Sequence, residues 1–197
     1  MTHICLGSAQ FGLNYGATNK SGIVSETEIA SILQLAHESS VRFIDTAQAY
    51  GHSQLTIGKN IISIHDFKFI SKLSPQDQAS FSPSDVNKWD DEIENTCSNL
   101  GVKSLDSFLI HNAEDLLKSG SSLLRDWILN LRSSGTVSRV GISIYDSSIL
   151  SEIDYSEFDL IQLPLSLYDQ RLLYDGTLDL LHSKGIAIHA RSIYLQG

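Results

Sequence analysis

Short runs of apolar residues alternate with longer amphipathic segments along the whole chain. The short runs have the length of buried strands, and the segments between them repeat apolar residues at helical spacing. This alternation is typical of βαβ units, which build parallel sheets. The pattern predicts seven strands, at residues 4–6, 42–45, 68–71, 107–110, 139–142, 160–163 and 186–189.

The segments between the strands carry helix start and stop signals. Ser25 with Glu28 forms a capping-box pattern, Ser82 and Pro83 suit the N-cap and the first helical position, and Gly101 suits a helix end. Helix-spaced apolar positions follow these starts and two later ones: Ile29, Ile32, Leu33 and Ala36; Val86, Trp89, Ile93 and Leu100; Leu123, Leu124, Trp127, Ile128 and Leu131 before Gly135; and Leu178 and Leu181 before Gly185. We therefore expect helices between the strands.

Two parallel-sheet folds fit this pattern, a (β/α)₈ barrel and a doubly wound open sheet. No linker rich in Pro or Gly divides the chain, so we expect a single domain over residues 1–197. Residues 7–12 at the first strand–helix junction read Gly-Ser-Ala-Gln-Phe-Gly rather than Gly-x-Gly-x-x-Gly. This departure argues against the dinucleotide-binding version of the open sheet.

Composition and charge narrow the possible partners. With 197 residues, of which 42% are hydrophobic, the chain can bury a sizeable core. Its formal net charge of −9 argues against a broad positive surface, so we expect neither nucleic acid nor a membrane as a partner. Cys5 and Cys97 offer no metal-binding pattern and no disulfide framework, which predicts free thiols and no bound metal. With no leader-like start and no apolar run of membrane-spanning length, we expect a cytoplasmic protein of unknown oligomeric state.

Four polar residues follow three consecutive predicted strands. Asp45 ends the second strand, Tyr50 comes five residues later, Lys72 follows the third strand, and His111 follows the fourth. In a barrel these positions face one shared mouth. A tyrosine can donate a proton to a carbonyl oxygen near neutral pH only if its pKa of about 10 is lowered, and a nearby lysine ammonium favours this lowering.

The other two residues complete that chemistry. The Asp45 carboxylate can orient the Lys72 ammonium, and the His111 ring can hydrogen-bond the oxygen that gains negative charge. Each residue also has a structural interpretation: Asp45 as an N-cap, Tyr50 as a rim aromatic, Lys72 as a solvated strand end, and His111 as a core histidine. The combination at consecutive strand ends favours the functional interpretation.

The runs that carry these residues resemble the signatures of the aldo-keto reductase family. They are Phe-Ile-Asp-Thr-Ala-Gln-Ala-Tyr-Gly at 43–51, Phe-Ile-Ser-Lys-Leu at 69–73 and Asp-Ser-Phe-Leu-Ile-His at 106–111. The likeness covers essentially the whole chain, and residues 191–197 are similar to bacterial members. It implies a (β/α)₈ barrel that transfers a hydride between a nicotinamide and an aldehyde, ketone or sugar carbonyl, with Tyr50 as proton donor.

The resemblance also implies a set of cofactor contacts. NADPH is the expected cofactor, and NADH is not excluded. The implied contacts are Ala9, Gln10, Asp45, Ser143, Gln162, Arg191 and Ser192. Two positions depart from the family pattern. Ile144 replaces an asparagine, and Arg191 replaces the aromatic residue that stacks on the nicotinamide, so this arginine could stack, bind a phosphate or form a rim ion pair.

The chain is shorter than a typical barrel of this type. A complete barrel has about 250 residues and eight strand–helix units, whereas seven strands are predicted here. We therefore expect an incomplete barrel, as a fragment or as a natural truncation. Two alternative functions stay open: an inactive barrel that binds a nucleotide or a protein, and an aldolase-type barrel with Lys72 as a Schiff base, which a nearby Asp45 carboxylate would oppose.

Overall fold

Seven parallel strands form one sheet in the computed structural model, which describes residues 3–194. The strands are β1 (Cys5–Gly7), β2 (Phe43–Asp45), β3 (Lys68–Leu73), β4 (Leu105–Ile110), β5 (Val137–Ser143), β6 (Leu160–Pro164) and β7 (Ala187–Arg191). They pair strictly in chain order, each with the next. A doubly wound sheet would reverse this order, so the barrel prediction is confirmed with seven strand–helix units present.

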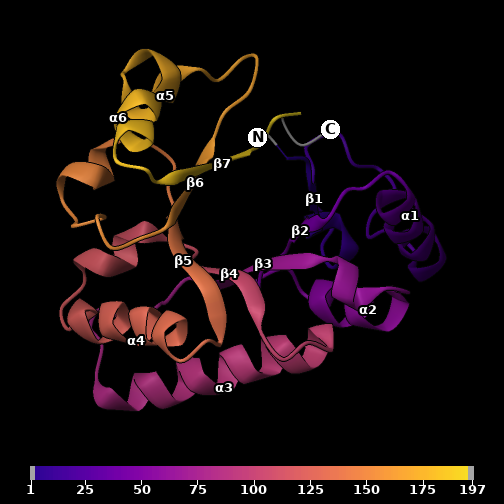
Figure 1. The fold of residues 1–197 in the computed structure, drawn as a ribbon, viewed down its shortest axis with the longest axis horizontal. Helices are drawn as coiled ribbons and strands as arrows, with labels where there is room; N and C mark the ends of the chain where they lie inside the picture. The colour runs from indigo at the N-terminus through magenta and orange to yellow at the C-terminus, as the bar shows by residue number, and fades with distance from the viewer. Residues whose placement is uncertain (1–2, 195–197) are drawn as a thin grey trace.

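Helices lie on the outer side of the curved sheet (Figure 1). They are α1 (Glu26–Glu38), α2 (Ser53–Asn60), α3 (Pro83–Leu100), α4 (Ser121–Ser133), α5 (Arg171–Tyr174) and α6 (Thr177–Ser183), with short 3₁₀ helices at η1 (Ala9–Phe11), η2 (Ile64–Asp66), η3 (Ala113–Leu117) and η4 (Ser148–Ser151). Residues 195–197, the end of the segment that resembles bacterial members, lie outside the described residues.

The predicted helix starts are present with their capping bonds. The Ser25 hydroxyl accepts a hydrogen bond from the Glu28 backbone N–H at 3.3 Å and begins α1. At α3 the Asp85 carboxylate accepts from the Ser82 backbone N–H at 2.9 Å. Gly101 ends α3 with a φ of 72°, a left-handed conformation that favours glycine.

The two faces of the sheet pack differently. Outward-facing side chains such as Ile44, Phe69 and Phe108 are fully buried against the helices and form the main core. A smaller cluster of inward-facing residues fills the barrel interior, with Ile70, Leu109 and Leu160 at its centre and Cys5 and Phe43 beside it. This alternation leaves the carboxyl ends of the strands free to present polar side chains.

Both cysteines are free and half-buried. Cys5 lies in the barrel interior and Cys97 packs against the core from α3. Burial raises the pKa of both thiols, so neither is activated as a thiolate. Within residues 3–194 no cluster of metal-ligating side chains occurs, and none of the helices there is both long and apolar enough to cross a membrane.

Candidate active site

The carboxyl ends of β2, β3 and β4 bring the four candidate residues together. Asp45 is the last residue of β2, Lys72 lies one residue before the end of β3, and His111 directly follows β4. Tyr50 lies in the loop between β2 and α2. This loop is held to the next strand, because the Thr46 backbone N–H donates to the Ile70 carbonyl at 2.9 Å.

Lys72 and Asp45 form a nearly buried ion pair. Lys72 Nζ lies 2.8 Å from both carboxylate oxygens of Asp45, and the lysine side chain has no exposed area. Its third hydrogen bond goes to the Thr46 carbonyl at 2.9 Å. All three ammonium hydrogens are therefore engaged, and the side chain is fixed in one orientation.

Tyr50 lies beside both the Lys72 ammonium and the His111 ring. Lys72 Nζ is 5.1 Å from the centroid of the Tyr50 ring. The His111 ring meets the Tyr50 ring edge-on, with 5.8 Å between the ring centroids. The four side chains thus converge at one end of the barrel, as expected from the order of the strand ends.

The pKa directions differ in part from the expectation. Burial raises the pKa of Tyr50 above its ordinary value, and the nearby Lys72 ammonium only reduces this increase. The expected net lowering is therefore wrong, because desolvation of the phenolate outweighs the attraction of one ammonium. Burial and the Lys72 charge lower the pKa of His111 to about 4. At neutral pH both Tyr50 and His111 are uncharged.

Gln162 and Ser143 lie beside this group on β6 and β5. Gln162 Nε2 donates to Asp45 Oδ1 at 3.0 Å and lies 3.0 Å from His189 Nδ1. Both Gln162 and Ser143 are almost fully buried. Within residues 3–194, neither the Ser143 hydroxyl nor the Gln162 side-chain carbonyl has a hydrogen-bond partner.

Arg191 is held at the end of β7 by stacking rather than by an ion pair. Its guanidinium carbon lies 4.2 Å from the centroid of the Tyr145 ring, and one Nη donates to the Ile144 carbonyl at 3.0 Å. No carboxylate pairs with Arg191 in the described part of the chain, so the rim ion pair, one of the alternatives for this residue, is not formed there. Ser192 follows with a φ of 59°, a rare conformation for a residue with a side chain.

Ala9 and Gln10 lie in η1, the short helix that follows β1. The Gln10 side chain donates to the Tyr15 carbonyl at 2.9 Å, and the Gln10 backbone carbonyl accepts from the Val24 N–H at 3.1 Å. Gln10 therefore stabilises its own loop in this structure.

Sequence reasoning missed two features of the site. His189, taken only as the end of a strand, contacts Gln162 in the barrel interior. Ser8 and Ser53 tie the first loop to the Tyr50 turn, because the Ser53 hydroxyl lies 2.9 Å from the Ser8 hydroxyl, which in turn donates to the Asp45 carbonyl at 2.9 Å. A signal for His189 exists in the alternation of β7, which places it on the same face as Arg191.

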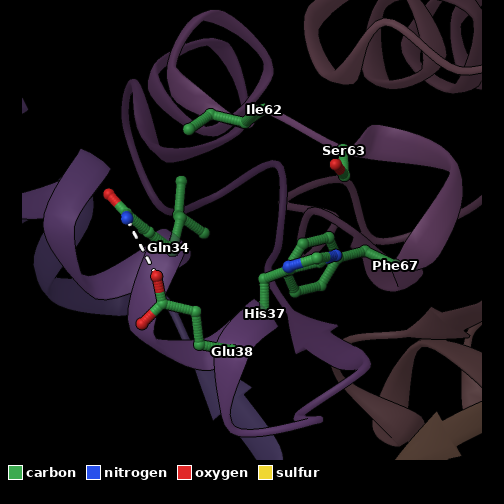
Figure 2. A pocket seen from close by; sticks show the side chains of 7 residues that line it. Gln34, His37, Glu38, Ile62, Ser63 and Phe67 are labelled. Atoms are coloured by element: carbon green, nitrogen blue, oxygen red, sulfur yellow. Dashed lines mark hydrogen bonds between the residues drawn. The ribbon is translucent and has the colours of Figure 1, made fainter.

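A pocket of about 220 Å³ lies elsewhere, on the outer surface between α1 and the loop before β3 (Figure 2). Its lining comprises Leu33, Gln34, His37, Glu38, Ile62, Ser63 and Phe67. Gln34 donates to Glu38 along its rim at 2.9 Å. None of the candidate site residues lines it, so it is separate from the group at the strand ends.

Strand order and polar strand ends define a (β/α)₈-type barrel with its candidate site at the carboxyl end of the sheet. The chain belongs to the aldo/keto reductase family, whose model matches residues 3–197. This membership supports a nicotinamide-dependent oxidoreductase. No curated protein matches the chain.

Solved structures agree with the fold. A Pseudomonas aeruginosa protein assigned to the aldo-keto reductases superimposes with a TM-score of 0.76 at 21% identity, over 95% of this chain and 72% of that chain. An aldo/keto reductase from Brucella melitensis superimposes with a TM-score of 0.67 at 22% identity, over 96% of this chain and 68% of that chain. An aldo/keto reductase from Klebsiella pneumoniae, in complex with NADP and acetate, superimposes with a TM-score of 0.72 at 19% identity, over 98% of this chain and 64% of that chain.

Proposed function

We propose that this chain carries the active site of an NADPH-dependent carbonyl reductase, with NADH as the alternative nicotinamide. The substrate class is an aldehyde, a ketone or a sugar carbonyl. The observation that carries the proposal is the position of Lys72 Nζ, which is bound to Asp45 on one side and lies 5.1 Å from the Tyr50 ring centroid on the other. An ion pair buried beside a phenol favours proton transfer from that phenol.

The residues at the strand ends fit the nicotinamide end of such a cofactor. The Ser143 hydroxyl and the Gln162 side-chain carbonyl have no partner within residues 3–194, and neither atom is among the fully buried ones without a partner, so both are open to a ligand. A carboxamide offers both a donor and an acceptor for these two groups. Arg191 adds a flat guanidinium, which its contact with the Tyr145 ring holds in place.

When bound, the nicotinamide supplies the hydride to the carbonyl carbon. Tyr50 gives its hydroxyl proton to the carbonyl oxygen, so that oxygen becomes an alcohol and Tyr50 a phenolate. Lys72 stabilises this phenolate with its charge, and Asp45 holds Lys72 in position. His111 is neutral and can donate a hydrogen bond to the same oxygen while its negative charge develops.

The raised pKa of Tyr50 is opposite to the expected lowering, but it leaves the phenol protonated at neutral pH. A phenol that stays protonated at neutral pH is always ready to donate, whereas a phenolate would have no proton to give. The driving force comes from the oxygen that receives the hydride, because an alkoxide is a much stronger base than a phenolate. Lys72 then limits the energetic cost of the charged intermediate state of Tyr50.

The geometry disfavours the Schiff-base alternative. A lysine attacks a carbonyl only as a neutral amine with a free lone pair. Lys72 Nζ instead donates to Asp45 and Thr46 through all three of its hydrogens. A carbonyl would have to displace this arrangement before reacting.

One experiment tests the proposal against both alternatives. The purified chain is titrated with NADPH by fluorescence and assayed for oxidation of NADPH with an aromatic aldehyde, a methyl ketone and an aldose. Binding with turnover supports the proposal. Binding without turnover on any substrate indicates an inactive nucleotide-binding barrel, and a borohydride-trapped adduct on Lys72 indicates Schiff-base chemistry.

A further inference from the structure

Gln162 and His189 lie side by side on neighbouring strands. Their Cα positions are paired in the register of β6 and β7. Gln162 Nε2 lies 3.0 Å from His189 Nδ1 and 3.0 Å from Asp45 Oδ1. Gln162 is 1% exposed, so bulk water does not compete for its amide.

The Asp45 carboxylate determines which way the Gln162 amide points. An ionised carboxylate only accepts hydrogen bonds, so the amide nitrogen must face it. Both carboxylate oxygens also accept from Lys72 Nζ, at 2.8 Å each. The same amide nitrogen faces His189, and therefore His189 Nδ1 must be the acceptor. The ring is then neutral, with its proton on Nε2.

We propose that His189 is a positioning residue that holds the Gln162 amide with its carbonyl oxygen directed to the nicotinamide carboxamide. This inference rests on the proposed function. Both hydrogens of Gln162 Nε2 are used by Asp45 and His189, which leaves Oε1 as the atom able to accept from the carboxamide. Without the acceptor on His189, one of these hydrogens has no partner and the amide is free to rotate.

This arrangement works only while His189 is neutral. The charged groups that face its ring are Asp45 on β2, Lys72 on β3 and Arg139 on β5. Burial lowers the pKa of His189, Lys72 and Arg139 lower it further, and Asp45 opposes them. Once the pH falls below this lowered pKa, which lies under the ordinary histidine value of about 6.5, protonation places an N–H on Nδ1 against the Gln162 N–H. NADPH affinity should then decrease.

Two substitutions separate this role from a merely structural one. His189→Leu removes the acceptor, whereas His189→Asn places Oδ1 near the position of Nδ1 and cannot be protonated in this range. At pH 7.5 we expect NADPH to bind about five- to ten-fold more weakly to His189→Leu, the effect of one lost hydrogen bond, and within about two-fold of wild type to His189→Asn. His182→Leu, on the exposed side of α6, is the matched control.

The pH profile gives the second readout. Wild-type affinity should fall only on the acid side of the ordinary histidine pKa of about 6.5, because the pKa of His189 is lowered. His189→Asn cannot titrate there, so its decrease should be smaller and should come from His111 alone. Equal affinity of His189→Leu and wild type at pH 7.5 overturns the inference. The inference is also overturned if NADPH affinity changes with pH in His189→Asn as steeply as it does in wild type.

A measurement without cofactor distinguishes the two proposals. The ¹⁵N shifts of the His189 ring in the free protein should report a proton on Nε2 and an accepting Nδ1, and Gln162→Leu should shift the Nδ1 signal. A proton on Nδ1 overturns the inference, whatever NADPH does. A second outcome is that the ring shifts show the proton on Nε2 but the protein binds no NADPH. This outcome refutes the proposed function and, with it, the role assigned to Gln162 Oε1.

Discussion

Lys72 lies with its ammonium nitrogen 2.8 Å from both oxygens of the Asp45 carboxylate, although no part of the lysine side chain is exposed. A buried charge of this kind is stable only with its partner, because removal of the partner leaves an uncompensated charge in a poorly solvated place. Stability and candidate chemistry therefore depend on the same ion pair.

Asp45→Asn should destabilise the fold by about 3 kcal/mol, since it keeps the shape of the side chain and removes the charge that compensates Lys72. Urea unfolding at neutral pH measures this loss. Asp154→Asn is the matched control, because Asp154 pairs with Arg125 on the surface and is 57% exposed. Its loss should stay below about 1 kcal/mol. Equal losses in the two variants would contradict a buried, mutually dependent pair.

Tyr50→Phe should abolish most carbonyl reduction while NADPH affinity stays within a few-fold of wild type. The hydroxyl acts on charge that develops only in the transition state, so its removal should reduce kcat by a factor on the order of 100 to 10,000. Steady-state kinetics and a fluorescence titration measure the two quantities separately. Tyr168→Phe, at an 84% exposed position, should change neither. Full turnover by Tyr50→Phe would exclude Tyr50 as the proton donor.

The strands and the main helices could be predicted because their burial follows simple periods. All seven expected strands are present, and the observed bounds extend most of them by one to three residues. α2 was missed because most of its buried side chains are polar: Ser53, Gln54 and Thr56 are buried along with Ile57. Hydrogen bonds such as Gln54 Nε2 to Ser71 Oγ at 2.8 Å make this burial possible, and no hydrophobic pattern reveals them.

The sequence predicts which residues meet at the candidate site, but not the pKa values of these residues. Asp45, Lys72 and His111 lie at or directly after strand ends, and the geometry of parallel strands brings strand ends together. The pKa of Tyr50 depends on how deeply the ring is buried, which the sequence does not encode locally. The same holds for His189, whose role depends on a neighbour 27 positions away in the chain.

Gly12→Ala should disturb the turn that carries Tyr50. A Cβ on Gly12 would lie 1.8 Å from the Tyr50 carbonyl oxygen and 2.6 Å from the Ser53 nitrogen, both backbone atoms. The turn must move, so we expect a loss of about 1 to 3 kcal/mol in stability, together with most of the reductase activity. Gly7→Ala is the control for stability, because its Cβ would meet nothing within 4 Å. An unchanged melting temperature for Gly12→Ala would show that this contact is not required.

Stability should decrease as the pH falls from about 6.5 to about 4. Burial and Lys72 lower the pKa of His111 to about 4, and burial also lowers that of His189. Between the unfolded value of about 6.5 and these folded values the unfolded chain binds more protons, so acid favours unfolding. His111→Asn should reduce this slope by up to about one proton in urea titrations at pH 4.5, 5.5, 6.5 and 7.5. A slope that is unchanged by the substitution would show that His111 titrates normally in the folded protein.

The 197-residue chain should self-associate through the outer strands of its sheet. Within residues 3–194, β1 pairs only with β2 and β7 only with β6, so one side of each carries unpaired backbone donors and acceptors. Ile188 on β7 is 36% exposed beside this edge. Such edges pair with other chains unless a charged side chain blocks them. Light scattering over a concentration series should therefore report species larger than a monomer.

Ile188→Lys should reduce this association, because a charge on an exposed edge strand must lose its hydration when another strand pairs with it. Leu35→Lys is the matched control, since Leu35 is 63% exposed on α1 and lies away from the edge strands. If both lysine variants associate as wild type does, the contact lies on another surface. A wild-type chain that stays monomeric at every concentration, with a sharp cooperative melt, would show that its open edges are protected without strand pairing, and that seven strands suffice for a stable barrel wall.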